Sequence, residues 1–132
     1  MRILISGGTG FVGSCLSGYL VERDHHVIAT GTRSRHTLEI SDRFEYVQAD
    51  TTVPGPWQEH VDGVDAVINL AGRSIFRYWT KSARRQIYES RILTTRNLVA
   101  AMGEKQCPLL LNTSAVGYFG DRGDELLQES SP

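Results

Sequence analysis

Residues 2–13 read RILISGGTGFVG, and this stretch decides the fold. A short apolar run typical of a buried strand breaks into glycines, and apolar residues then recur at helical intervals over 14–22. Gly7 would allow a tight turn off the strand, and Gly10 would let the backbone approach a pyrophosphate. Gly13 would let the helix pack against the strand. A strand, a glycine turn and a helix in this order predict a dinucleotide-binding unit.

Two other interpretations of the glycine stretch are weaker. A Walker-type phosphate loop is excluded because no Gly-Lys-Ser or Gly-Lys-Thr follows the turn. A tight structural turn without a ligand is the remaining alternative. The position of the glycines between a strand pattern and a helix pattern favours the dinucleotide, because that context is the confirming test for the motif.

The bulk composition predicts one globular domain spanning residues 1–132. Hydrophobic residues make up 40% and charged residues 22%, which is ordinary for a folded soluble protein. The net charge of −1 gives no reason to expect nucleic acid or a membrane surface as a partner. Cys15 and Cys107 are expected to be buried thiols in a reducing, cytoplasmic compartment. The histidines have no metal-ligand spacing with them, so no metal site is expected.

The rest of the chain alternates strand and helix patterns. Apolar or alternating runs predict four more strands, at 27–30, 44–49, 65–72 and 109–114. A long helix is predicted over 80–102. Such alternation implies an α/β fold of Rossmann type, a doubly wound parallel sheet with strand order 3-2-1-4-5.

The predicted helix over 80–102 carries an apolar stripe and a basic set. The stripe at helical spacing is expected to face the core, and it consists of Tyr88, Ile92, Thr95, Val99 and Met102. The basic residues are most simply a solvated face: Lys81, Arg84, Arg85, Arg91 and Arg96. Alternatively, Arg91 faces the site and meets an anionic substrate.

Residues 6–13, 69–72 and 113–120 resemble the extended and atypical short-chain dehydrogenases/reductases. The chain is most similar to their nucleoside-diphosphate-sugar epimerase-like branch, which residues 78–81 and 90–99 fit specifically. The resemblance covers essentially the whole chain but only the first half of the family's usual length. It implies a fold truncated relative to the family, with NAD or NADP as cofactor and a nucleotide-sugar or other small molecule as substrate. It also implies a possible homodimer.

The resemblance also implies roles for individual residues. A cofactor would meet the glycine turn, the end of the second strand, the end of the third and the loop after the fourth. These residues are Gly7, Thr9, Gly10, Phe11, Val12, Gly13, Thr32, Arg33, Ser34, Asp50, Thr51, Asn69, Ala71 and Gly72. Ser114, or Thr113 beside it, would lie near the nicotinamide and hydrogen-bond the reacting oxygen.

The end of the second strand favours NADP over NAD. An NAD site usually places a carboxylate there to accept from the ribose hydroxyls, whereas arginine suits a 2′-phosphate. Here the strand is followed by Thr32, Arg33 and Ser34, and the first carboxylate is Glu39. Arg33 offers a permanently charged donor fork. The alternative is that Arg33 and Arg35 belong to a solvated loop.

Catalytic residues of the family are missing or replaced. No tyrosine in the chain has a lysine four residues later. Arg91 stands where the extended pattern has asparagine, and Arg73-Ser74 replaces an acidic-Asn pair. Two hypotheses therefore stand. In the first, the chain is the cofactor domain of an epimerase or oxidoreductase whose chemistry is completed by residues outside it. In the second, it is a regulatory or scaffold protein that binds NADP(H) without turnover.

Overall fold

A computed structural model describes residues 1–34, 41–103 and 109–131. Its centre is a five-stranded sheet in the order β3-β2-β1-β4-β5, in which every neighbouring pair is parallel. The strands are β1 (Arg2–Ser6), β2 (His26–Gly31), β3 (Phe44–Gln48), β4 (Ala66–Asn69) and β5 (Leu110–Asn112). The predicted fold class and strand order are confirmed.

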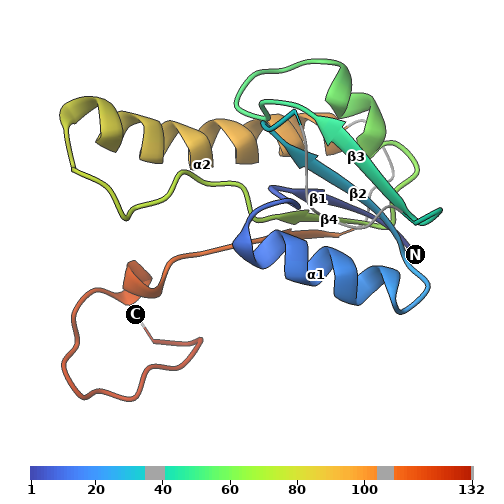
Figure 1. The fold of residues 1–132 in the computed structure, drawn as a ribbon. Helices are drawn as coiled ribbons and strands as arrows, with labels where there is room; N and C mark the ends of the chain where they lie inside the picture. Colours follow the sequence, from blue (N-terminus) through green and yellow to red (C-terminus); the bar gives the residue numbers. More distant parts are fainter. Residues whose placement is uncertain (35–40, 104–108, 132) are drawn as a thin grey trace.

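Helices cover both faces of the sheet (Figure 1). Helix α1 (Phe11–Val21) lies on one face, where its Leu16 and Leu20 pack on Ile3, Ile5 and Val27. Helix α2 (Lys81–Met102) and the short 3-10 helix η1 (Pro56–Val61) lie on the other. After β5, the segment with the 3-10 helix η2 (Val116–Phe119) extends away from the sheet (Figure 1).

The second core lies between the sheet and α2. Leu98 of α2 meets Trp57 and Val61 of η1 over the strand residues Leu4 and Val67. All five side chains are buried, and strand residues that alternate in sequence point to opposite faces. The two cores therefore follow directly from the apolar runs of β1, β2 and β4.

Helix α2 begins and ends close to its predicted bounds. Thr80 is the N-cap, and its Oγ1 accepts a hydrogen bond of 3.1 Å from the backbone N–H of Ala83. Threonine is a favoured N-cap because this bond satisfies one of the unpaired N–H groups of the first turn.

The predicted inward stripe of α2 is wrong at Tyr88, Ile92 and Val99, whereas Thr95 is half-buried and bonds Asn69 and Asn112. Tyr88, Ile92 and Val99 are 65%, 40% and 50% exposed, whereas Met102 is half-buried against the second core. The buried face is instead made of Ala83, Ser90, Thr94, Asn97 and Leu98. Hydrogen bonding overrides apolar periodicity here, because the three polar members find partners on neighbouring loops.

The expected burial of the cysteines is not confirmed at Cys15. Cys15 is exposed on α1 rather than buried, and Cys107 lies outside the described residues. Within the described ranges, no helix is long and apolar enough to cross a membrane. The same ranges contain no group of three or more potential ligands from His, Cys, Asp and Glu that could hold a metal ion.

Candidate functional site

The carboxyl ends of the strands open onto a cavity of about 450 Å³, which we call the large cavity. Its walls come from the glycine turn, the end of β2, residues 49–52 after β3, residues 70–74 after β4, and one face of α2. In open α/β sheets, ligands bind at this edge, where the strand order reverses between β1 and β4.

The glycine turn after β1 forms a cradle that larger residues would fill. Gly7 has φ +76°, and a Cβ at Gly13 would lie 2.2 Å from the Gly7 carbonyl oxygen. A Cβ at Gly10 would lie 3.1 Å from the same oxygen. Gly10 is the N-cap of α1 and supplies no side-chain cap, so N–H groups of the first turn remain available to an anion. The turn fits the diphosphate of a dinucleotide.

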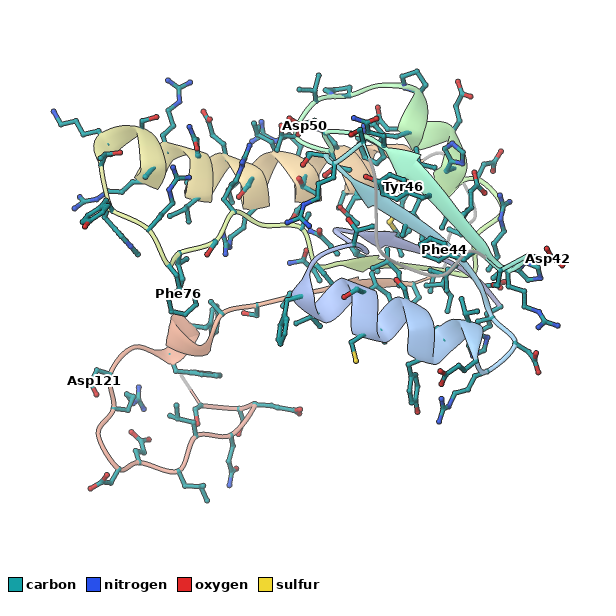
Figure 2. The ribbon with its side chains drawn as sticks, viewed as in Figure 1. Asp42, Phe44, Tyr46, Asp50, Phe76 and Asp121 are labelled. Carbon is teal, nitrogen blue, oxygen red and sulfur yellow. The ribbon has the colours of Figure 1, made fainter. Side chains whose placement is uncertain are left out.

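Tyr46 of β3 holds the end of β2 in place. Its Oη lies 2.9 Å from the carbonyl oxygen of Gly31 and 2.5 Å from that of Arg33, and it also bonds the side chain of Thr9. Burial raises the pKa of the Tyr46 phenol, against the lowering effect of the Thr9 bond and the Arg33 guanidinium. The single phenolic hydrogen can be donated to one of these two carbonyls at a time. Figure 2 shows Tyr46 on β3 beneath this edge of the sheet.

Arg33 is the cation that the end of β2 presents to the large cavity. It is exposed, and its guanidinium forms no ion pair with any described carboxylate. The two acidic residues that line the cavity each have a partner within the protein other than Arg33. Asp50 Oδ1 accepts from the N–H and hydroxyl of Thr52 at 3.0 and 2.6 Å, and Glu89 pairs with Arg85 at 2.7 Å.

Small polar side chains join the wall after β3 to α2. The hydroxyl oxygens of Thr51 and Thr94 lie 3.1 Å apart, and Asn97 Nδ2 donates to the Thr51 carbonyl at 2.9 Å. Helix α2 thereby contributes cavity residues that our sequence analysis missed: Gln86, Glu89, Ser90, Leu93 and Thr94. The sequence signal for this wall was the helical spacing of Ser90, Thr94 and Asn97, which places them on one polar face of α2. In the structure that face is buried.

A second cavity of about 310 Å³, the small cavity, adjoins the first across the loop 70–74. At its base, Asn69 Nδ2 donates to Asn112 Oδ1 at 2.8 Å and to Thr95 Oγ1 at 3.1 Å. The Thr113 hydroxyl donates to the Asn69 carbonyl at 2.5 Å. β4, β5 and α2 are thus bonded to one another directly beneath the small cavity.

The structure divides the residues that the sequence singled out. The large cavity collects Gly7, Thr9, Gly10, Thr32, Arg33, Asp50, Thr51, Ala71 and Gly72. The small cavity is lined by Asn69, Thr113 and Ser114, and shares Ala71 and Gly72. Phe11, Val12, Gly13 and Ser34 line neither. Phe11 is 97% exposed, whereas Gly13 is buried beneath the turn.

Of the basic residues on α2, only Arg91 lines the small cavity, and none lines the large one. The solvated face is supported for the others, Lys81, Arg84, Arg85 and Arg96, which are all exposed. Arg91 lines the small cavity, as the alternative interpretation of the basic residues expected.

Comparison with known proteins agrees with this geometry. The profile of the NAD dependent epimerase/dehydratase family matches residues 3–132. The chain is 37% identical over 133 residues to the epimerase family protein YfhF of Bacillus subtilis, covering 99% of this chain and 43% of that protein. It is 31% identical to the chloroplastic SDR39U1 homolog of Arabidopsis thaliana, covering 100% of this chain and 39% of that protein.

Among solved structures, the chain is similar to the UDP-glucuronic acid 4-epimerase of Bacillus cereus, determined with NAD and a fluorinated UDP-glucuronic acid derivative. The TM-score is 0.82 at 20% identity, over 98% of this chain and 45% of that one. The likeness establishes a shared fold, and the chain spans less than half the length of these relatives. On the family match and the curated relatives, the chain belongs to the NAD-dependent epimerase/dehydratase family.

Proposed function

We propose that the chain binds NADP(H) in the large cavity as the cofactor domain of a nucleoside-diphosphate-sugar epimerase or related oxidoreductase. The observation that carries the proposal is the conjunction of the glycine cradle with Arg33 at the end of β2. The cradle suits a diphosphate, and an arginine without a described carboxylate partner suits a 2′-phosphate.

In this proposal each wall of the large cavity meets one part of the cofactor. The turn at Gly7 and Gly10 faces the diphosphate, Arg33 the 2′-phosphate, and Asp50 with Thr51 the adenine. Thr113 and Ser114, which line the adjoining small cavity, would lie toward the nicotinamide. The cofactor would supply hydride transfer, and the residues of this chain would bind and orient it.

The preference for NADP has a direct test in paired titrations. We expect Arg33→Ala to weaken NADPH binding about tenfold, equivalent to ~1.4 kcal/mol, and to leave NADH binding nearly unchanged. Nicotinamide fluorescence measures both affinities. Arg96→Ala is the matched control, because Arg96 is exposed on α2 and lines neither cavity. Equal affinity for the two cofactors, unchanged by Arg33→Ala, would contradict the assignment.

Binding without turnover is the second candidate function. The chain has Thr113 and Ser114 but no tyrosine followed four residues later by lysine. Such a pair serves as the proton-exchanging group in this superfamily, and here it would have to come from residues outside this chain. Absorbance at the nicotinamide band separates the candidates, since an enzyme oxidises or reduces its cofactor when substrate is added.

The proposal includes a homodimer and a cytoplasmic location. Tyr88, Ile92 and Val99 form an exposed apolar stripe on α2, and such a stripe commonly marks an association surface. Light scattering of the wild type and of Ile92→Glu tests the dimer. The exposed, free thiol of Cys15 suits a reducing compartment, which imaging of a fluorescent fusion tests.

A further inference from the structure

The small cavity is rich in positive charge. Arg73 and Arg91 line it, and none of its described lining residues is acidic. The large cavity differs, since Asp50 and Glu89 line it beside Arg33 and Arg73. A concave surface lined by two permanently charged arginines and no described carboxylate has a positive potential that attracts anions.

Arg73 and Arg91 also lack the partners that other arginines have. Arg43 pairs with Asp24, Arg85 with Glu89 and Arg122 with Glu125. Among the described residues, no carboxylate lies within ion-pair distance of Arg73 or Arg91. Their charges are therefore available to a ligand rather than neutralised by the protein.

The Arg91 guanidinium is held in position by backbone groups. Its Nη1 donates to the carbonyl oxygens of Ile87 at 3.0 Å and Arg73 at 3.3 Å. The backbone at Gly72 lies against the guanidinium, and a Cβ there would be 3.2 Å from Arg91 Cζ. These contacts use Nη1 and leave Nη2 and Nε without a recorded hydrogen bond among the described residues. A preorganised fork is the donor geometry that carboxylates and phosphates match.

Hydroxyl groups face the same space as Arg91. Ser114 and Ser74 line the small cavity, and no described residue bonds the Ser114 hydroxyl. The loop 70–74 separates this space from the large cavity by a single backbone segment. A molecule in the small cavity would therefore lie next to a dinucleotide in the large one.

We propose that the small cavity binds an oxyanion of the substrate, a carboxylate or a phosphate, with Arg91 as its main donor and Arg73 as the second cation. This inference rests on the proposed function, since it gives the substrate class for that site. The oxidised nicotinamide ring carries a positive charge. Two arginines near it therefore favour binding of an anion, which would lie beside the ring. The two sources are a sugar acid and the diphosphate of a nucleotide-sugar.

The test is calorimetric titration of the 132-residue chain with three probes, with and without saturating NADPH. Sodium glucuronate presents a carboxylate, uridine diphosphate presents phosphates, and glucose is the neutral control. We expect at least one anion to bind, glucose not to bind, and Arg91→Gln to weaken the anion about tenfold. Arg84→Gln is the matched control, because Arg84 lies two turns earlier on the same side of α2 and lines neither cavity.

The outcomes separate this inference from the proposed function. Arg91-dependent binding of glucuronate alone assigns a carboxylate, and that of uridine diphosphate alone assigns a phosphate. Failure of both anions, or an equal effect of Arg84→Gln, overturns the site. A tenfold loss of NADPH affinity in Arg91→Gln would make Arg91 a cofactor residue and also overturn it.

Two further results keep the test decisive. If the wild type binds an anion but not NADPH, the proposed function fails while the oxyanion site stands. Circular dichroism shows whether Arg91→Gln folds. If it does not, Arg73→Gln replaces it and is expected to weaken the same anion severalfold, and an unchanged affinity would overturn the site.

Discussion

The large and small cavities are neighbours built in different ways. One wall of the large cavity is the glycine turn, where missing Cβ atoms leave room for a diphosphate beside the backbone. The small cavity depends on side chains that three separate segments bring together: the loop after β4, the middle of α2, and the end of β5. A backbone-built site tolerates little added volume, whereas a side-chain-built site responds to changes of charge and hydrogen bonding.

The two cavities also differ in charge. The large cavity mixes acidic and basic residues and would hold a cofactor in several contacts of similar strength. The small cavity has two arginines, which pair with no described carboxylate, above a base of neutral amides and hydroxyls. We therefore expect mutations in the first to act through shape and mutations in the second to act through electrostatics.

The largest expected effect comes from adding one methyl group beneath the glycine turn. In Gly13→Ala the new Cβ would lie 2.2 Å from the Gly7 carbonyl oxygen and 2.7 Å from Gly8 Cα, so backbone must move. We expect a loss of stability of at least ~3 kcal/mol and loss of NADPH binding, measured by thermal denaturation and titration. Gly18→Ala on the same helix meets no atom within 4 Å and is expected to stabilise by about 0.5–1 kcal/mol. Similar effects of the two substitutions would show that the turn is not tightly packed.

The next largest effect is expected at the base of the small cavity. Asn69 is 4% exposed and donates from Nδ2 to Asn112 and Thr95. Asn69→Asp removes that donor and sets a carboxylate against Asn112 Oδ1, which we expect to cost about 1–3 kcal/mol. Chemical denaturation measures the change, and NADPH affinity should fall much less than anion affinity.

The control for Asn69→Asp adds the same charge and removes only a longer hydrogen bond, the one that Asn112 Nδ2 donates to the Thr113 carbonyl at 3.4 Å. Asn112 Oδ1 accepts from both Asn69 and Thr95, so Asn112→Asp preserves these two bonds. We expect it to weaken anion binding through its charge but to leave stability nearly unchanged. Unaltered stability in Asn69→Asp itself would indicate that the Asn112 amide rotates and donates in return.

The smallest expected effect belongs to Tyr46, which supports the large cavity from below. Tyr46→Phe removes the hydroxyl that lies between the carbonyls of Gly31 and Arg33. One hydrogen bond contributes about 1 kcal/mol, so NADPH affinity should fall roughly fivefold while NADH affinity changes less. Tyr19→Phe, on the exposed side of α1, is the control. Equal losses for the two cofactors would indicate that Tyr46 supports stability without orienting Arg33.

Local sequence patterns predicted the glycine turn and the strand ends of the large cavity, but not its wall on α2. The spacing of glycines after an apolar run identifies a turn that only small residues can make, so the cradle and the strand before it were predictable. The position of Arg33 beside the cavity was predictable for a similar reason, because Arg33 lies just after the end of β2 in the sequence. Phe11 and Val12 were expected to supply loop backbone to the cofactor. Their side chains are exposed, and the backbone role stays a prediction.

The amino-acid sequence by itself determined the bounds of α2 and the glycine cradle, because each depends on residues close together along the chain. The sheet order followed from the alternation of strand and helix patterns, although β1 pairs with β4 from a distant part of the chain. Only the tertiary structure decided which face of α2 is buried and that Arg91 meets the loop after β4. Apolar periodicity selected Tyr88, Ile92 and Val99, yet the hydrogen-bond partners of Ser90, Thr94 and Asn97 lie on distant segments. A helix buries the face whose polar groups find partners, and those partners are set by the packing of the whole sheet.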